Sequence, residues 1–178
     1  MSTDELMIIQ IPTGVKVDVK DNVVTAQGSL GTNTRSANTR FLSVAKQGDS
    51  VVVEPLKKGK LAKKAMEAEH ALGKEIQNDM LGVTKYFEIR MKTVFAHFPM
   101  SIEVKGDKLL VNNLIGERCP RVADIRANSK VEVKGADIRV YGVSKDAVSQ
   151  TAGNIRLACK IRNKDTRAFQ DGAYYEIE

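Results

Sequence analysis

The feature that most constrains the fold of this chain is an internal repeat with a long period. Residues 17–20 (Val-Asp-Val-Lys) and 102–105 (Ile-Glu-Val-Lys) share one pattern of apolar and charged residues, 85 positions apart. The same offset, without a gap, pairs apolar with apolar residues and glycine with glycine: Val24 with Leu109, Leu30 with Ile115, and Gly31 with Gly116. An offset of 87 pairs Gly48, Val51 and Val53 with Gly135, Ile138 and Val140. Because solenoid repeats have periods of roughly 20–50 residues, this spacing indicates a duplicated domain.

The length of the chain agrees with two small domains. Its 178 residues, 42% of them hydrophobic, suffice for two domains of about 90 residues that each bury a core. We predict a first repeat over residues 1–84, in which residues 1–10 are peripheral, and a second repeat over residues 85–178. The predicted fold class is α+β: two tandem copies of an antiparallel sheet packed with one long helix.

Alternation of apolar and polar residues, interrupted by turn residues, predicts the strands of both repeats. The first repeat is expected to contain strands over residues 15–19, 23–27, 41–44 and 51–54, with a loop over residues 28–32. The second is expected to contain strands over residues 87–91, 131–133, 138–140 and 174–177, a hairpin turn at Gly106-Asp107 and another turn over residues 135–137.

Two segments with apolar residues at spacings of three or four predict helices. The first covers residues 60–81, and Gly82 is placed to end it. The second starts near Ser144, a suitable N-cap, and continues to about Ala158.

The sequence offers little for catalysis. His70 is expected on a helix surface, and His97 in an extended segment before Pro99, where it positions that loop. The chain lacks GxSxG, Walker, HExxH and GxGxxG motifs, and we assemble no activated nucleophile or acid–base pair from it. Cys119 and Cys159 have no metal-ligand spacing and are expected to be two independent thiols. We therefore expect no enzyme, no cofactor, no metal and no small-molecule substrate.

Basic charge gathers after the second predicted helix. The net charge of the chain is +6, of which residues 86–178, with 16 basic and 12 acidic residues, carry +4. Residues 153–167 contain five basic residues against Asp165 alone: Arg156, Lys160, Arg162, Lys164 and Arg167. Arginine, lysine and Asn163 can bind phosphate, sugar or base edges, and Phe169, Tyr174 and Tyr175 can stack on unpaired bases. The alternative interpretation is a charged surface strip with its aromatic residues in the core.

Two other basic groups are weaker candidates. Lys57, Lys58, Lys60, Lys63 and Lys64 surround the start of the first helix, either as a solvated face or as a phosphate contact. Arg118, Arg121, Arg126 and Lys130 could extend the interface of the second repeat, although Glu117 and Asp124 dilute their charge.

Several short sequence motifs, spread over nearly the whole chain, resemble those of a known protein family and occur in the same order. They are residues 11–12, 15–19, 28–31, 80–84 (Met-Leu-Gly-Val-Thr), 94–99 (Val-Phe-Ala-His-Phe-Pro), 113–117 (Asn-Leu-Ile-Gly-Glu), 162–165 (Arg-Asn-Lys-Asp) and 169–172 (Phe-Gln-Asp-Gly), with the paired tyrosines. The chain thereby resembles the universal large-subunit ribosomal protein family usually called L-six, in its archaeal and eukaryotic form.

The resemblance implies a non-catalytic protein that binds large-subunit rRNA near the stalk base and the factor-binding centre, beside other large-subunit proteins. Carried over by position, its RNA contacts fall on Arg162, Asn163, Lys164, Arg167 and Gly172. Arg156 and Lys160 extend this set on charge alone.

Two other function classes remain open from the residues. A protein–protein interaction module without RNA contact is the main alternative, and a hydrolase would need a charged cluster in a pocket. No apolar stretch reaches the roughly 20 residues of a membrane span, and the polar start is no signal peptide. We expect a cytoplasmic location, in the ribosome.

Overall fold

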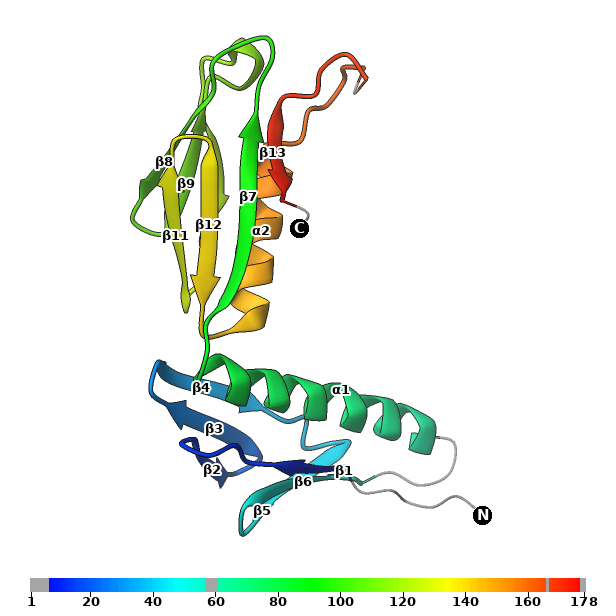
Figure 1. The fold of residues 1–178 in the computed structure, drawn as a ribbon. Helices are drawn as coiled ribbons and strands as arrows, with labels where there is room; N and C mark the ends of the chain where they lie inside the picture. Colours follow the sequence, from blue (N-terminus) through cyan, green and yellow to red (C-terminus); the bar gives the residue numbers. More distant parts are fainter. Residues whose placement is uncertain (1–6, 57–60, 166, 177–178) are drawn as a thin grey trace. The chain divides into compact units, whose positions relative to one another are not determined.

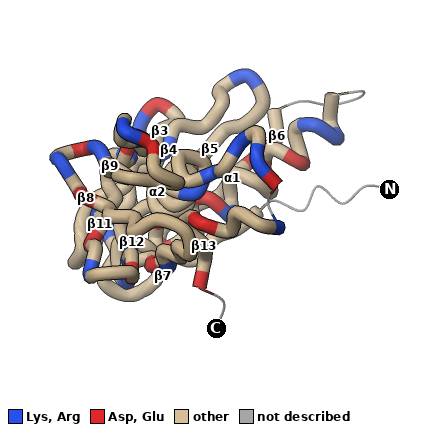
Figure 2. The backbone as a smooth tube through the Cα atoms, turned by 90° about the horizontal axis from the view of Figure 1, so that it is seen from above, with Lys and Arg blue, Asp and Glu red and all other residues tan. Residues whose placement is uncertain are grey.

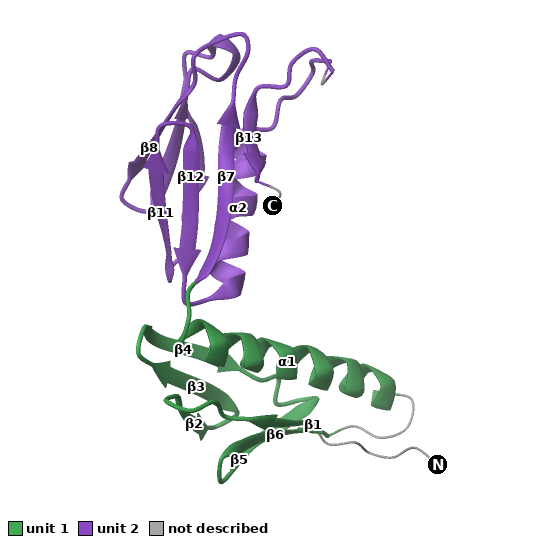
Figure 3. Cartoon of the chain, in the orientation of Figure 1, with its two compact units in different colours: residues 1–86 green, residues 87–178 purple. Residues whose placement is uncertain are grey.

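The structure, a computed structural model, describes residues 7–56, 61–165 and 167–176. It divides into two compact units, unit 1 (residues 1–86) and unit 2 (residues 87–178) (Figure 3). Antiparallel sheets and two helices make up the described chain, so the predicted α+β class is confirmed (Figure 1).

Unit 1 is built from two three-stranded antiparallel sheets and one helix. The first sheet has the order β1 (Met7–Gln10), β6 (Ser50–Pro55), β5 (Leu42–Gln47), and the second has the order β2 (Lys16–Lys20), β3 (Val23–Gly28), β4 (Gly31–Ser36). The helix is α1 (Ala62–Gly82). Apolar side chains from both sheets and from α1 form one core, which includes Val17, Val24, Val53 and Ile76.

Unit 2 repeats this plan and adds a strand. Its four-stranded sheet has the order β11 (Ser129–Lys134), β12 (Asp137–Gly142), β7 (Phe87–Val94), β13 (Gly172–Tyr175). Its three-stranded sheet has the order β10 (Arg121–Asp124), β9 (Lys108–Asn112), β8 (Ser101–Lys105). A short 3-10 turn, η2 (Leu114–Gly116), follows β9, and α2 (Lys145–Ala158) follows β12.

The strand orders of the sheets show that the sequence repeat is also a repeat of the fold. The order β1-β6-β5 corresponds to β7-β12-β11, and β2-β3-β4 corresponds to β8-β9-β10. Val17 and Ile102, matched by the sequence, occupy the first strands of corresponding hairpins, and Val53 and Val140 occupy corresponding sheet centres. Among the described strands of unit 1, none corresponds to β13.

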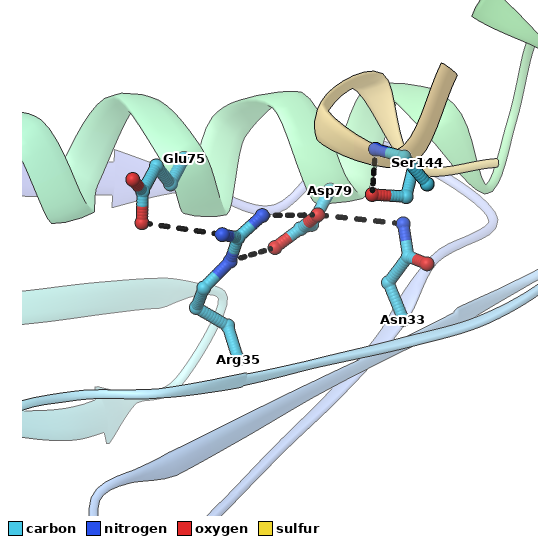
Figure 4. A network of polar contacts seen from close by, with 6 residues as sticks. Asn33, Arg35, Glu75, Asp79 and Ser144 are labelled. Carbon is cyan, nitrogen blue, oxygen red and sulfur yellow. Dashed lines mark hydrogen bonds and ion pairs between the residues drawn. The ribbon is translucent and has the colours of Figure 1, made fainter. Parts of the chain in front are cut away.

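The two helices start differently. Ser144 caps α2 as predicted, because its hydroxyl oxygen accepts a hydrogen bond from the backbone N–H of Ala147 at 3.4 Å (Figure 4). Leu61 precedes α1 and offers no such side-chain cap. The predicted stop at Gly82 has the right position but a different cause. The backbone stays right-handed at Val83 (φ −78°, ψ −10°), so no left-handed glycine ends this helix.

The loop predicted over residues 28–32 is wrong. Only Ser29 and Leu30 form a turn, and β4 begins at Gly31. Its sequence, Gly-Thr-Asn-Thr-Arg-Ser, has no apolar alternation because the residue that it buries is Asn33. The short strand β10 was not predicted either.

A polar network explains how such a strand packs against a helix (Figure 4). The guanidinium of Arg35 donates to both carboxylate oxygens of Asp79, at 2.9 and 3.1 Å, and Asn33 donates to the same carboxylate at 3.4 Å. The carboxylate oxygen Oε2 of Glu75 lies 3.4 Å from Nη1 of Arg35. Since Asp79 is buried, these donors replace the water that its charge would lose.

Candidate nucleic-acid interface

The predicted site residues lie in or beside the segment that connects α2 to β13 in unit 2 (orange to red in Figure 1). Arg156 occupies the last turn of α2, and Gly172 is the first residue of β13. The other predicted residues, Lys160, Arg162, Asn163, Lys164 and Arg167, are exposed positions of the connecting segment. Thr166 lies outside the described residues.

Most of these cations are free to meet an outside partner. Arg156, Lys160, Arg162 and Lys164 are exposed, and none forms an ion pair with an acidic residue in the described part of the chain. Arg167 differs, because its guanidinium lies 3.2 Å from the carboxylate of Asp165. This hydrogen bond holds the pKa of Asp165 below its usual range. The charge of Arg167 is therefore less available to an outside partner than the charges of the other four cations.

Aromatic rings stand beside the cations at the surface. The guanidinium carbon of Arg156 is 5.3 Å from the ring centre of Tyr174 and 5.6 Å from that of Tyr175. The ammonium of Lys164 is 5.5 Å from the ring centre of Phe169. Both tyrosines are exposed, at 38% and 42%. The alternative in which the aromatic residues belong to the core is therefore wrong for the tyrosines.

Strand β13 fixes the end of the segment. Gly172 pairs with Val94, and Ala173 with Thr93, so the strand extends the four-stranded sheet at β7. The hydroxyl of Tyr174 donates to the carbonyl of Gln170 at 3.0 Å. Gly172 has φ +155°, a conformation that side chains rarely adopt, and an added Cβ would lie 3.5 Å from the carbonyl oxygen of Cys159.

A buried carboxylate ties the segment to the loop between β7 and β8. One oxygen of Asp171, Oδ1, accepts from the backbone N–H of Ala96 at 2.8 Å and lies 3.4 Å from Nδ1 of His97. Burial opposes ionisation, but the donors on Ala96 and His97 outweigh it and lower the pKa of Asp171. The ring of His97 also lies 4.9 Å from that of Phe169. The predicted role of His97 in positioning its loop is confirmed.

A second connection joins the start of the segment to β10. The guanidinium of Arg121 donates to the carbonyl oxygens of Ala158 and Lys160, at 3.0 and 2.7 Å, which follow from the end of α2. It also binds Glu117 through two hydrogen bonds, which raises the pKa of Arg121 and lowers that of Glu117. The sequence presented Arg121 as a possible RNA contact, but the structure uses it to satisfy the end of a helix.

The loop between β9 and β10 is strained. Ile115 has φ +50° and ψ +37°, which is rare for a β-branched residue and costs about 1–3 kcal/mol. Its side chain packs against the core, and Asn113 donates to the carbonyl of Pro99 at 2.9 Å. These contacts hold the loop beside the β7–β8 loop.

A cavity of about 510 Å³ opens between the end of α2 and β13. It is lined by Gly153, Arg156, Leu157, Cys159, Lys160, Ile161, Phe169, Asp171, Gly172, Ala173 and Tyr174. The structure thus brings Arg156, Lys160 and Gly172 to one hollow. The other predicted residues do not line it. Leu157 and Ile161 were missed because they are apolar and carry no charge signal, and Asp171 was missed because it lies 15 positions from Arg156.

The remaining candidates separate into described and undescribed positions. Lys57, Lys58 and Lys60 lie outside the described residues, whereas Lys63 and Lys64 are exposed near the start of α1. His70 is exposed on α1, as predicted. Both cysteines are free, Cys119 exposed and Cys159 buried, which confirms two independent thiols.

Basic and acidic positions are interspersed along most of the backbone (Figure 2). Within the described residues, no group of three or more His, Cys, Asp or Glu residues is arranged to hold a metal ion. None of the described helices is long and apolar enough to cross a membrane.

Comparison with known proteins gives one consistent result. The family model for ribosomal protein L6 matches residues 98–172. The large ribosomal subunit protein uL6 of Methanocella arvoryzae is 38% identical over 175 residues, which are 98% of this chain and 97% of that protein. The uL6 proteins of Methanobrevibacter smithii and Haloarcula marismortui are 39% and 34% identical, and each alignment covers 93% of this chain and 92% of the relative. The chain therefore belongs to the ribosomal protein L6 (uL6) family, a family of structural ribosomal components and not of enzymes.

Proposed function

We propose that the protein is a structural constituent of the large ribosomal subunit that binds large-subunit rRNA through unit 2. The contact surface is the segment between α2 and β13 together with its flanking residues: Arg156, Lys160, Arg162, Asn163, Lys164, Arg167 and Gly172. Its place is near the stalk base and the factor-binding centre, beside other large-subunit proteins, where it supports translation.

The observation that carries this proposal is a set of four exposed cations that form no ion pair among the described residues: Arg156 at the end of α2, and Lys160, Arg162 and Lys164 on the anchored segment. Phosphate groups attract such cations, and binding releases the counterions condensed on the RNA. The segment is held by Asp171 at one end and by Arg121 at the other, so less order must be gained on binding. A-form RNA is recognised mainly by its shape and backbone, which suits cations presented on a fixed loop.

The first test asks whether RNA holds the protein in the subunit. The tagged full chain is followed in sedimentation gradients of a cell lysate before and after RNase treatment. We expect it to co-sediment with large subunits and to leave that fraction once the RNA is digested. A chain that stays with a protein partner after RNase treatment would favour the interaction module without RNA contact.

The second test asks which cations bind. Lys160, Arg162 and Lys164 are replaced together by alanine, and the affinity for large-subunit rRNA is measured against salt concentration. Each lost phosphate contact lowers the slope of log affinity against log salt by about 0.7–0.9, so we expect a change of about 2–3. The matched control replaces Lys16, Lys20 and Lys74, which removes the same charge from exposed positions of unit 1. Equal changes in both variants would contradict the proposal.

A further inference from the structure

The cavity between α2 and β13 has features that phosphate contacts alone do not explain. Its volume of about 510 Å³ lies within the roughly 300–1,000 Å³ of small-ligand pockets. Leu157, Ile161 and Phe169 give it apolar and aromatic walls. Such walls offer nothing to a phosphate group, but they suit the flat apolar faces of a nucleobase.

The charged groups of the lining lie at different depths. Arg156 and Lys160 are exposed, whereas Asp171 is only 2% exposed. Oδ1 of Asp171 is occupied by Ala96, but its other oxygen, Oδ2, is buried and has no hydrogen-bond partner among the described residues. Because Oδ2 is closed to solvent, a ligand in the cavity would meet the negative charge of Asp171 without bonding to that oxygen.

The cations at the surface and the carboxylate deeper in the cavity determine how a ligand would be oriented. A carboxylate repels phosphate, so the anionic part of the ligand must stay outside, on Arg156 and Lys160. The part that enters must be flat, largely apolar and without negative charge. A nucleotide has this arrangement, since its phosphate and its base lie at opposite ends.

We propose that the cavity receives the base of one unpaired nucleotide of the RNA, between its apolar walls, with the phosphate of that nucleotide on Arg156 and Lys160. This inference rests on the proposed rRNA binding and adds to it a specific feature of the RNA. The base must be unpaired, because a base inside a helix cannot present its Watson–Crick edge to a protein pocket.

Gly153 provides a way to close the cavity without removing a cation. It lines the cavity from α2, and a Cβ added there would meet nothing within 4 Å. A leucine at this position would fill part of the space that the base needs, whereas an alanine would leave most of it open. Both residues favour a helix more than glycine does, so the fold is expected to survive either change.

The test compares Gly153→Leu with Gly153→Ala in the full chain, using large-subunit rRNA as ligand. We expect Gly153→Leu to weaken binding about tenfold while the salt slope stays unchanged, and Gly153→Ala to bind like the unaltered protein. Unaltered affinity in Gly153→Leu would overturn the inference but leave the cation contacts in place. If the unaltered protein itself fails to bind rRNA, the proposed function fails instead.

A second readout does not depend on rRNA binding. Amide NMR spectra are recorded while AMP, CMP or GMP is added, with ribose 5-phosphate as the control that lacks a base. We expect the nucleotides to shift the amides of Cys159, Phe169 and Ala173 in the unaltered protein but not in Gly153→Leu. Shifts that are the same with ribose 5-phosphate, or the same in both proteins, would count against base insertion.

Discussion

The two units share a topology but differ at the edges of their sheets. In unit 1, the ammonium of Lys46 on β5 donates to the carbonyl of Val17 on β2 at 2.9 Å and so bridges the edges of the two sheets. The repeat places Val133 and Ile102 at the corresponding positions of unit 2. There a groove of about 850 Å³ lies along β8 and is lined by Val131 and Val133 of β11.

Their charges follow the same contrast. Unit 1 joins β4 to α1 through a partly buried arginine–carboxylate pair, whereas the cations near the end of α2 in unit 2 form no ion pair within the part of the chain that the structure describes. Unit 2 also has internal ion pairs, such as Arg121 with Glu117 and Arg139 with Glu88, so this contrast concerns the end of α2.

The largest effect is expected from breaking the internal pair of unit 1. Asp79→Ala leaves Arg35 and Asn33 without their acceptor and should cost about 3 kcal/mol of unfolding free energy, since a partly buried charge loses its partner. Hydrogen exchange of the amides of Val51 and Val53 reports on this unit.

The control is an exposed ion pair of the same unit. Asp18 and Lys20 are 67% and 83% exposed, so Asp18→Ala should cost less than about 1 kcal/mol. If the two variants exchange at the same rate, the network of Asp79 does not stabilise unit 1 in the way described.

A medium effect is expected where Lys46 bridges the sheets. Lys46→Met keeps the apolar stem but loses the hydrogen bond to Val17, which should cost about 1 kcal/mol in urea unfolding. Lysine also protects sheet edges from pairing with other chains, so this variant should self-associate more in sedimentation velocity runs. The reciprocal change, Val133→Lys, should reduce any self-association of the unaltered protein. Unchanged sedimentation in both would show that the edge lysine has no protective role.

A smaller effect is expected at the start of α2. Ser144→Ala removes the acceptor for the N–H of Ala147, and because that bond is long, the cost should be near the low end of cap substitutions, about 0.5–1 kcal/mol. Ser149→Ala in the exposed middle of α2 is the matched control and should be neutral or slightly stabilising. Thermal unfolding followed by circular dichroism compares them, and equal midpoints would contradict a capping role.

The smallest effect concerns the pH dependence of unit 2. Hydrogen bonds from Arg139 and Arg90 lower the pKa of Glu88 from 4.5 to about 2. A carboxyl whose pKa is depressed in the folded state stabilises above its unfolded pKa, and this contribution is lost as pH falls from about 4.5 to 2. In Glu88→Gln, the midpoint of urea unfolding should therefore depend less on pH between about 4.5 and 2. Because the ion pairs of Glu88 are exposed to solvent, the difference should be small. A parallel pH profile would refute the role of this pair.

The sequence predicted what depends on local pattern. The hairpin at Gly106-Asp107, the cap at Ser144 and the strands with apolar alternation are confirmed because each is fixed by neighbouring residues. Strand β4 escaped prediction because its buried residue is Asn33, whose partner Asp79 lies 46 positions away. Nothing local distinguishes such a polar strand from a loop.

The candidate site shows the same limit. The basic segment and its aromatic neighbours can be read from residues 156–175, and their role in RNA binding stays a prediction. The two anchors of that segment, Asp171 on Ala96 and Arg121 on the end of α2, join residues 75 and 37–39 positions apart. Charge alone made Arg121 look like an RNA contact, because a sequence does not show which cations are already engaged.

The burial of Cys159 gives the protein a built-in reporter. Its thiol is buried beside the backbone of Ala173 in β13, and burial raises its pKa, so alkylating reagents should modify the exposed Cys119 first. Cys159 should become reactive only when β13 detaches from β7. The rate of its alkylation would therefore time the detachment of that strand, with no label added to the chain.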